Sequence, residues 1–435
     1  MTGGIIFAAP KSGSGKTLIV AGLLRLLRNR GSRAAAAKCG PDYIDPTFHT
    51  RASGRPCVNL DPWAMRPATL AAILSDLESS AELVLCEGVM GLFDGAGPGA
   101  ASGSTAELAR LTGWPVVLVV DAGGQGGSVA ALIEGFARHD PRVPIAGVIL
   151  NRVASPRHRA LLGDAIAQYL PELPMLGAMP GTESLVLASR HLGLVPADEI
   201  ADIDTLLGRA AARIEEACDI DRLAALATPA RLMTAQGPSG LPPLGRHIAV
   251  ARDAAFLFTY EATLAGWRRQ GAALSFFSPL ADEPPSLQAD AIYLPGGYPE
   301  LHAGRLAAAS RFLAGLRDGS QTIYGECGGY MVLGEMLIDA NGTTHRMAGL
   351  LPLKTSFAER CRHLGYRAVR LLGSGPLGDA GDGFRGHEFH YATIVEEKGE
   401  PLFAVGDTSG ANLGRAGLRR GNVFGSFVHL IDRAD

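Results

Sequence analysis

The sequence lacks closely spaced cysteines. Its six cysteines are scattered along the chain, and none forms a C-x-x-C pair of the kind that holds a structural zinc ion. Without such pairs, we expect most of them to be small, buried hydrophobic residues in a reducing compartment. They are Cys39, Cys57, Cys86, Cys218, Cys327 and Cys361.

Long hydrophobic runs and an excess of positive charge are also missing. No apolar stretch approaches the ~20 residues that cross a bilayer, and the N-terminus lacks the basic and apolar regions of a signal peptide. Lys and Arg, 40 in all, do not outnumber the 43 Asp and Glu, so the chain has no surplus charge for nucleic-acid phosphates. We therefore expect a soluble, cytoplasmic protein that binds neither membranes nor nucleic acid.

What the sequence does contain is material for two or three cores, with 47% hydrophobic residues among 435. Up to about residue 225, short apolar runs such as PVVLVVDA alternate with helical patterns such as TAELARLTG. This rhythm predicts a doubly wound α/β domain, whose ligands bind at the carboxyl ends of the strands. Residues 228–245 are rich in Pro and Gly and predict a linker. The α/β pattern then restarts with different motifs, so we predict domains at 1–227 and 246–435.

The first candidate site is a phosphate-binding loop, PKSGSGKT at residues 10–17, between an apolar run and a helical pattern. Pro10 replaces the first glycine of G-x-x-x-x-G-K-[ST], but the variant K-x-G-x-G-K-T matches from Lys11 onward. Small residues let backbone N–H groups approach phosphates at a helix N-terminus, Lys16 neutralises phosphate oxygens, and Thr17 offers a hydroxyl to Mg²⁺. The predicted ATP-binding residues of the loop are Lys11, Gly13, Ser14, Gly15, Lys16 and Thr17.

Acidic residues follow the next predicted strands. Asp42 and Asp45 lie in GPDYIDP, and Glu87 ends an apolar strand, with Asp94 in the glycine-rich loop behind it. Carboxylates at the strand ends beside a phosphate-binding loop are suited to Mg²⁺, so Thr17, Asp45 and Glu87 are the predicted metal ligands. Asn151, at the end of PIAGVILN, is a candidate for reading adenine.

The second candidate site is YGECGGYMVLG at residues 324–334, which resembles a nucleophile elbow. Small residues would expose Cys327 at a helix N-terminus, which is expected to lower the pKa of its thiol. The backbone N–H groups of Gly297 and Gly328 are candidates for an oxyanion hole. A late histidine would act as the base, and spacing alone does not choose between His429, in GSFVHL, and the pair in GHEFHY, His387 and His390.

The motifs LPGGYPE, ECGGYM and GSFVHL together are similar to the class I glutamine amidotransferases. That resemblance implies a flavodoxin-like domain that releases ammonia from glutamine, with Cys327 as nucleophile and His429 as base. Most of the class carry Glu two residues after the histidine, where this chain has Ile431. Asp432 lies one residue further on and would point the other way in an extended strand.

Over almost its full length, the chain resembles the cobyrinic and hydrogenobyrinic acid a,c-diamide synthases. APKSGSGKT, GPDYIDP, NLDPWAM, EGVMGLFDG, LPGGYPEL, ECGGYM, GHEFHY and GSFVHL occur in that family's order. The resemblance implies a dethiobiotin synthetase-like P-loop domain that uses ATP and Mg²⁺ to amidate the a and c acetates of the macrocycle through acyl phosphates, in cobalamin biosynthesis. It also implies that Asp42, Tyr43 and Asp94 handle the substrate.

Several alternatives stay open. Cobyric acid synthase amidates other side chains of the same macrocycle but usually lacks the YIDP segment. A partition-type ATPase switch would explain Lys11 and would leave Cys327 among its glycines unexplained. A free-standing glutaminase would not need Lys16 and Thr17. The Ala- and Arg-rich composition is typical of high-GC genomes and favours the metal-free hydrogenobyrinic acid over cobyrinic acid. The oligomeric state is open, with a homodimer as one candidate.

Overall fold

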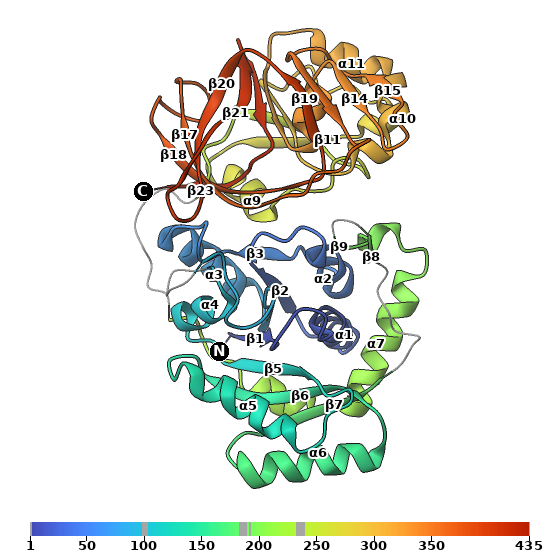
Figure 1. Cartoon of the computed structure of the whole chain (residues 1–435), viewed down its shortest axis with the longest axis vertical. Coiled ribbons are helices and arrows are strands. Elements are labelled where there is room, and N and C mark those ends of the chain that lie inside the picture. Colours follow the sequence, from blue (N-terminus) through green and yellow to red (C-terminus); the bar gives the residue numbers. More distant parts are fainter. Residues whose placement is uncertain (1, 98–102, 182–188, 191–192, 232–239, 435) are drawn as a thin grey trace. The chain divides into compact units, whose positions relative to one another are not determined.

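The computed structural model describes residues 2–97, 103–181, 189–190, 193–231 and 240–434, and the chain forms two compact units (Figure 1). The first comprises Met1–Trp63 and Pro67–Gly237, and the second comprises Ala64–Arg66 and Pro238–Asp435. Part of the predicted linker, residues 232–239, lies outside the described residues. The domain limits 1–227 and 246–435 therefore stay a prediction.

A parallel sheet of seven strands forms the centre of the first unit, in the order β3-β2-β4-β1-β5-β6-β7. Its strands are near-continuous apolar runs such as VVLVVD, as expected where helices cover both faces of a sheet. They are β1 (Gly3–Ala8), β2 (Ala34–Cys39), β3 (Val58–Leu60), β4 (Leu83–Glu87), β5 (Val116–Asp121), β6 (Ile145–Val153) and β7 (Met175–Pro180).

The helices cover both faces of this sheet, with α1, α2 and α7 on one side and α3 to α6 on the other (Figure 1). Right-handed crossovers require this division. The connections from β1 to β2 and from β2 to β3 run toward one end of the sheet, and those from β3 onward run toward the other end, so their helices lie on opposite faces. The carboxyl end of β1 is therefore the switch point where ligands of such folds bind. The helices are α1 (Lys16–Asn29), α2 (Asp45–Ser53), α3 (Pro67–Ser80), α4 (Thr105–Thr112), α5 (Ser128–His139), α6 (Pro156–Tyr169), α7 (Ile203–Ala217) and α8 (Ile220–Ala225), with the 3₁₀ turn η1 (Ala197–Glu199) and the short strands β8 (Ser189–Arg190) and β9 (Gly193–Leu194).

The second unit is built on a ten-stranded sheet, β11-β10-β12-β13-β22-β21-β20-β17-β18-β23. Its first five strands are parallel. Numbered along the chain, those five have the order 2-1-3-4-5, which is the flavodoxin-like order that was predicted. The elements up to the elbow are β10 (His247–Ala251), α9 (Glu261–Arg269), β11 (Ala273–Phe277), η2 (Pro279–Ala281), β12 (Ala291–Leu294), η3 (Pro299–Leu301), α10 (Ala303–Ala308), α11 (Ser310–Arg317), β13 (Thr322–Glu326) and α12 (Gly328–Leu333).

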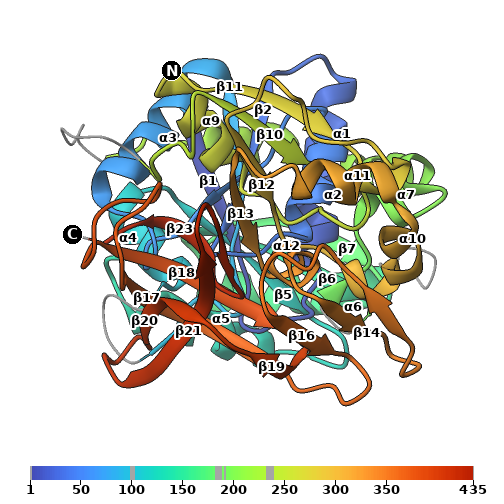
Figure 2. The ribbon, with the colours of Figure 1, turned by 90° about the horizontal axis from the view of Figure 1, so that it is seen from above.

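Antiparallel strands extend this sheet beyond β22, and Figure 2 shows β17, β18, β20 and β21 side by side. A separate four-stranded sheet has the order β15-β14-β16-β19. The last strand, β23, pairs with β18, so that His429 lies directly opposite His387. These strands are β14 (Met336–Ile338), β15 (Thr344–Arg346), β16 (Leu353–Ser356), β17 (His363–Leu371), β18 (Gly383–His390), β19 (Thr393–Glu397), β20 (Glu400–Gly406), β21 (Asn412–Arg420), β22 (Val423–Ser426) and β23 (His429–Arg433).

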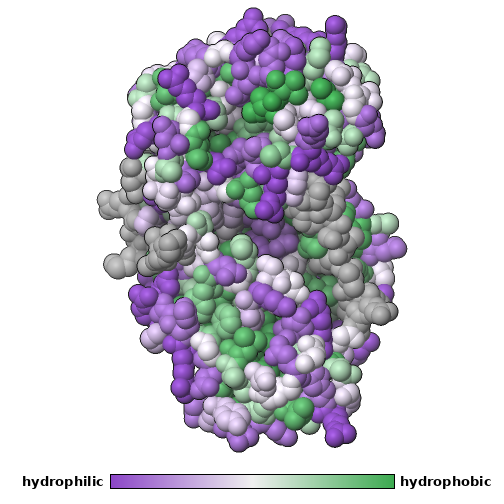
Figure 3. Space-filling model, in the orientation of Figure 1, coloured by the Kyte–Doolittle hydropathy of each residue, from purple (hydrophilic) through white to green (hydrophobic). Residues whose placement is uncertain are grey.

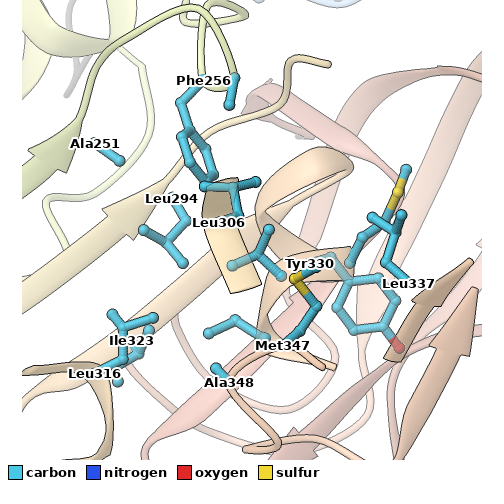
Figure 4. Close-up of a cluster of buried hydrophobic side chains, with 14 of the residues drawn as sticks. Ala251, Phe256, Leu294, Leu306, Leu316, Ile323, Tyr330, Leu337, Met347 and Ala348 are labelled. Atoms are coloured by element: carbon cyan, nitrogen blue, oxygen red, sulfur yellow. The ribbon is translucent and has the colours of Figure 1, made fainter. Parts of the chain in front are cut away.

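A hydrophobic cluster supports helix α12 (Figure 4). Leu294 and Ile323 contribute to it from neighbouring parallel strands, and Leu306 contributes from α10. Tyr330 and Met331 of α12 are buried in the same cluster. Each fully buried side chain of this size contributes roughly 1.5–3 kcal/mol, so the cluster fixes the helix that follows Cys327.

Among the described residues, no helix is both long enough and apolar enough to span a bilayer. Large hydrophobic side chains that are exposed include Leu161 on α6, Phe276 on β11, and Ile394 and Val395 on β19. On the visible face of each unit, hydrophobic patches are interspersed with hydrophilic residues (Figure 3).

Candidate functional site

The phosphate-binding loop connects β1 to α1 in the first unit. Gly13 and Gly15 have φ angles of 77° and 92°, a backbone conformation that favours glycine. A Cβ at Gly15 would lie only 2.2 Å from Nδ2 of Asn151, so the loop also needs glycine for close packing. The hydroxyl of Ser14 donates to the carbonyl of Lys11 at 3.0 Å. The residues predicted to hold ATP therefore form one tight turn at the switch point.

The two lysines of this loop differ in their surroundings. Lys11 is exposed, whereas Lys16 is buried at the start of α1. The Lys16 ammonium donates to the carbonyl of Met90 at 2.7 Å. Burial lowers the pKa of Lys16, and the nearby Glu87 carboxylate opposes that effect. Lys16 is thus aimed at the loop that follows β4.

Glu87, at the carboxyl end of β4, contacts side chains from α1, α2 and β2. Its Oε1 accepts a hydrogen bond from the Thr17 hydroxyl at 2.8 Å, and its Oε2 lies 2.6 Å from Nε2 of His49. Its Oε1 also lies 3.2 Å from the ammonium of Lys38. Burial alone raises the pKa of Glu87, but Lys38 and His49 lower it to about 2. Glu87 is therefore an ionised carboxylate held by polar partners.

Lys38 joins the two carboxylates that were predicted to bind metal. Its ammonium lies 2.5 Å from Oδ2 of Asp45 and 3.2 Å from Oε1 of Glu87, although only 3% of its side chain is exposed. Burial lowers the pKa of Lys38, but Asp45 and Glu87 together raise it well above its usual range. Burial and the neighbouring Asp42 raise the pKa of Asp45.

Sequence reasoning missed both Lys38 and His49. For Lys38 a signal was present, since a single charged residue interrupts the run AAAAKC. A lysine is almost never fully buried unless it is paired, and the acidic GPDYIDP directly follows this strand. His49 lies in the helical pattern of α2 and had no comparable signal.

The oxygen atoms around Lys38 suit a divalent metal. Thr17 supplies a hydroxyl, and Asp45 and Glu87 supply carboxylates, which are the hard oxygen ligands that Mg²⁺ prefers. The Lys38 ammonium contacts both carboxylates, so they are close enough together to share one cation. The predicted ligand set therefore fits Mg²⁺. A carboxylate that bound the metal would exchange its contact with Lys38 for one with the ion.

The remaining predicted residues of this site lie in the surrounding loops. Oδ1 of Asp42 accepts the N–H groups of Ile44 and Asp45, at 2.7 and 3.0 Å, just before α2. Asn59 donates to the carbonyls of Gly40 and Asp42 and so braces the same turn, in which Tyr43 is half-buried. The carboxylate of Asp94 is exposed and accepts the N–H of Gly91, and the amide of Asn151 donates to the carbonyl of Ser14.

In the second unit, Cys327 forms a strained turn between β13 and α12. Its φ of 48° and ψ of −103° are uncommon for a residue other than glycine, as in a nucleophile elbow. A Cβ at Gly329 would lie 1.9 Å from the carbonyl oxygen of Leu294, which only a glycine can accommodate. The glycines after Cys327 therefore let α12 begin directly against β12.

His429 lies beside Cys327 in the structure. A Cβ at Gly296 would lie 2.2 Å from Cε1 and 3.0 Å from Nε2 of His429, and 3.3 Å from Cβ of Cys327. The Cε1–Nε2 edge of the imidazole and the cysteine side chain thus approach the same side of Gly296. Burial, followed by the nearby His387 and His390, lowers the pKa of His429 to about 3, so the ring is neutral and able to accept a proton.

The two predicted oxyanion donors are neighbours. A Cβ at Gly328 would lie 3.0 Å from the amide nitrogen of Gly297. Gly297 itself is packed against the carbonyl of Ala255, 2.1 Å from the position of a Cβ. The two backbone amides therefore come together at the N-terminus of α12, beside Cys327.

The expectation for the thiol is wrong in this conformation. Burial raises the pKa of Cys327 well above its usual range, and Glu300 adds to the effect. A backbone hydrogen bond from Gly328 lowers the pKa but is outweighed. Because α12 has only six residues, its N-terminus offers little to offset the burial. The buried thiol needs a base before it can attack.

The motif GHEFHY lies on β18, close to this site. His387 is opposite His429, and His390 is stacked on Phe427 at 3.9 Å between ring centroids. Nε2 of His390 lies 3.0 Å from a carboxylate oxygen of Glu388, whose other oxygen accepts from Arg367 at 2.6 Å. His363, Glu388 and His390 lie close enough to share an ion, but the guanidinium of Arg367 already neutralises that carboxylate. Of the three candidate histidines, His429 has the contacts of a base.

Comparison with known proteins agrees with both sites. Residues 5–195 match the CobQ/CobB/MinD/ParA nucleotide binding domain family, and residues 247–435 match the CobB/CobQ-like glutamine amidotransferase domain family. The chain is 55% identical over 435 residues to the hydrogenobyrinate a,c-diamide synthase of Brucella suis biovar 1. The aligned region covers 99% of this chain and 98% of that protein. The chain belongs to the hydrogenobyrinate a,c-diamide synthase family.

Other members of the family are nearly as similar. The hydrogenobyrinate a,c-diamide synthase of Rhizobium meliloti is 53% identical over 437 residues, covering 99% of both chains. That of Rhodobacter capsulatus is 52% identical over 432 residues, covering 98% of both. Among solved structures, the septum site-determining protein MinD of Pyrococcus horikoshii is 18% identical, covering 42% of this chain and 84% of that one, with a TM-score of 0.30. At that TM-score the likeness carries no weight.

Membership of the hydrogenobyrinate a,c-diamide synthase family confirms the resemblance predicted from the motifs. It confirms an enzyme of the ligase class with a nucleotide-binding P-loop domain and a glutamine amidotransferase domain. The roles of the individual site residues stay predictions. The structure adds that the residues predicted for each site converge within one unit.

Proposed function

We propose that this chain uses ATP and glutamine to amidate the a and c acetate side chains of hydrogenobyrinic acid, in cobalamin biosynthesis. The observation that carries the proposal is the identity of 52–55% with relatives of that name, which extends across both domains. The same relatives favour the metal-free macrocycle over cobyrinic acid as the substrate. The two sites supply the chemistry that such a reaction needs.

The first unit activates the carboxylate. A carboxylate oxygen of the substrate attacks the γ-phosphorus of ATP, the bond to ADP breaks, and an acyl phosphate forms. Backbone N–H groups of residues 13–17 and the ammonium of Lys16 stabilise the charge on the phosphate oxygens. Mg²⁺, when bound, would offset further charge on the triphosphate, and Thr17, Asp45 and Glu87 would hold it. Asp42, Tyr43 and Asp94 lie in the loops around this site and are proposed to handle the macrocycle.

The second unit supplies ammonia. His429 takes the proton of Cys327, and the thiolate attacks the side-chain amide carbon of glutamine. The Gly297 and Gly328 amides stabilise the resulting oxyanion. His429 then donates the proton to the amide nitrogen as its bond to carbon breaks, which releases ammonia and leaves a thioester on Cys327. Water then hydrolyses the thioester to glutamate. In the first site, ammonia displaces phosphate from the acyl phosphate and leaves an amide.

The direct test is ATP hydrolysis in the presence of hydrogenobyrinic acid, with either glutamine or ammonium as nitrogen source. We expect hydrogenobyrinic acid to stimulate phosphate release with both sources. Lys16→Ala should lower that release by at least about 100-fold, because transition-state charge on the phosphate loses its partner. Cobyrinic acid serves as the comparison substrate. If neither macrocycle stimulates hydrolysis, the partition-type ATPase switch becomes the better account.

A further inference from the structure

The amidotransferase site lacks the carboxylate expected after its histidine. Ile431 occupies the position two residues after His429, and its buried side chain carries no charge. Asp432 is also buried, but the Arg66 guanidinium donates to it at 2.9 and 3.2 Å and the Arg66 backbone N–H donates at 2.9 Å. Asp432 is therefore committed to Arg66 and is not the partner of the imidazole.

Another carboxylate reaches the imidazole from a different strand. Oε2 of Glu326, the residue just before Cys327, lies 3.8 Å from Nδ1 of His429. Oε1 of the same carboxylate accepts the backbone N–H of Leu430 at 3.0 Å. Glu326 is thus held next to the first two residues of β23. The opposite edge of the ring, with Nε2, faces Gly296 and Cys327.

We propose that Glu326 is the positioning residue for His429, replacing the carboxylate that most class I amidotransferases carry two residues after the histidine. Glu326 holds the imidazole with a proton on Nδ1, so that Nε2 is the unprotonated nitrogen that takes the proton of Cys327. It also stabilises the imidazolium that forms when the proton is transferred. This inference rests on the proposed glutamine-dependent function.

The hydrogen bonds of Glu326 favour this role. The hydroxyls of Tyr293 and Tyr324 donate to its two oxygens, at 2.6 and 2.9 Å, and the Leu430 amide donates to Oε1. With these donors fixed, the carboxylate cannot turn away from the imidazole. The 3.8 Å separation exceeds the roughly 2.7–3.2 Å of a hydrogen bond, but such contacts often tighten only when substrate binds and charge develops.

Burying a carboxylate here is unfavourable for folding. Only 2% of Glu326 is exposed, and burial raises its pKa to about 7. The hydrogen bonds from Tyr293, Tyr324 and Leu430 offset part of this cost, and they hold the carboxylate beside the imidazole. His387, His390 and Glu388, all on β18, shift the pKa of His429. Glu388 is paired with His390 and Arg367, which leaves Glu326 as the carboxylate for Nδ1.

The test compares Glu326→Gln and Glu326→Asp with the wild type, using glutamine-dependent and ammonium-dependent amidation of hydrogenobyrinic acid across pH 6–9. Glu397→Gln is the matched control, because Glu397 also accepts a tyrosine hydroxyl, from Tyr330 at 2.6 Å, in the same unit. Ammonium-dependent amidation does not use the Cys327 site and reports on the ligase half of each variant.

For Glu326→Gln, we expect the glutamine-dependent kcat to fall by about 100-fold or more, given the losses seen when a catalytic histidine loses its carboxylate. The wild-type glutamine profile should rise with pH through about 7 as Glu326 ionises, and this limb should vanish in Glu326→Gln. Glu326→Asp should keep the limb and recover part of the rate. Glu397→Gln should resemble the wild type in both respects.

Two results would overturn the inference. One is a Glu326→Gln enzyme that stays within about threefold of the wild-type glutamine rate and keeps the acid limb. The other is an equal loss in Glu397→Gln, which would point to packing alone. If the wild type itself fails to use glutamine, the proposed function fails instead, and the two failures are told apart by the wild-type assay.

Discussion

At the scale of single residues, the first unit depends on a buried lysine. Lys38 is one of the few charged side chains inside the parallel sheet, and its ammonium contacts Asp45 and Glu87. Removing a partner from a buried ion pair leaves uncompensated charge, which is far more costly than losing the same contact at the surface. Lys38 therefore holds the two carboxylates together.

Lys38→Met should lower the free energy of unfolding of the first unit by about 3–5 kcal/mol, because the Asp45 and Glu87 carboxylates lose their buried cation. Urea titration, with hydrogen exchange of peptides from β2 and β4 as the local readout, measures the change. Lys354→Met is the control, since Lys354 also contacts two carboxylates, Glu335 and Glu396, but is partly exposed. Its effect should be about 0–1 kcal/mol. Equal effects of the two substitutions would contradict the buried ion pairs of Lys38 with Asp45 and Glu87.

At the scale of elements, the elbow depends on how closely α12 approaches β12. Gly329 lies so near the Leu294 carbonyl that a methyl group would overlap it, at 1.9 Å. Because Cys327 immediately precedes α12, any displacement of the helix also displaces the thiol from His429. A shift of about 1 Å in a reacting group can cost on the order of 100-fold in rate.

We therefore expect Gly329→Ala to reduce glutamine-dependent amidation by about 100-fold, while ammonium-dependent amidation persists. Gly266→Ala on α9 is the control, because its Cβ would meet only the end of the Arg269 side chain at 3.9 Å. As a helix-interior position it should gain about 0.5–1 kcal/mol of stability without loss of activity. Steady-state rates with each nitrogen source check both variants. A Gly329→Ala enzyme with full glutamine activity would contradict the close packing of α12.

The elements that the sequence predicts best are the buried parallel strands. Local composition alone predicts a strand for a run such as VVLVVD and a loop before a helix for PKSGSGKT. The structure has a strand and a loop at these positions. The antiparallel strands were not predicted, because a strand such as NLGRAGLRR has one solvent-facing side and no continuous apolar run. GSFVHL is divided between two strands, because β22 ends at Ser426 and β23 begins at His429.

The site residues divide in the same way. Cys327, Lys16 and Thr17 could be predicted because their motifs are contiguous in sequence. The partners of His429 and Glu87 could not, since Glu326 is 103 residues from His429 and reaches it only through the order of strands in the sheet. Sequence periodicity contains no information about which strands are neighbours, and so the positioning carboxylate was found only in the structure.

At the scale of the whole molecule, one chain carries two sites, each within its own compact unit. The first has the residues proposed to activate a carboxylate with ATP, and the second has those proposed to release ammonia from glutamine. The similarity to the family extends over both units, so both belong to the same enzyme. The central claim is that the nitrogen released at Cys327 becomes the amide nitrogen of the product.

That claim is tested most directly by mass spectrometry of the product formed from hydrogenobyrinic acid, ATP and glutamine labelled with ¹⁵N in its side-chain amide. We predict a diamide in which both new nitrogens are ¹⁵N for the wild type, and no labelled product for Cys327→Ala, which should still form the diamide from ¹⁵N-ammonium. A labelled diamide from Cys327→Ala with glutamine, or a wild type that forms none, would contradict the account.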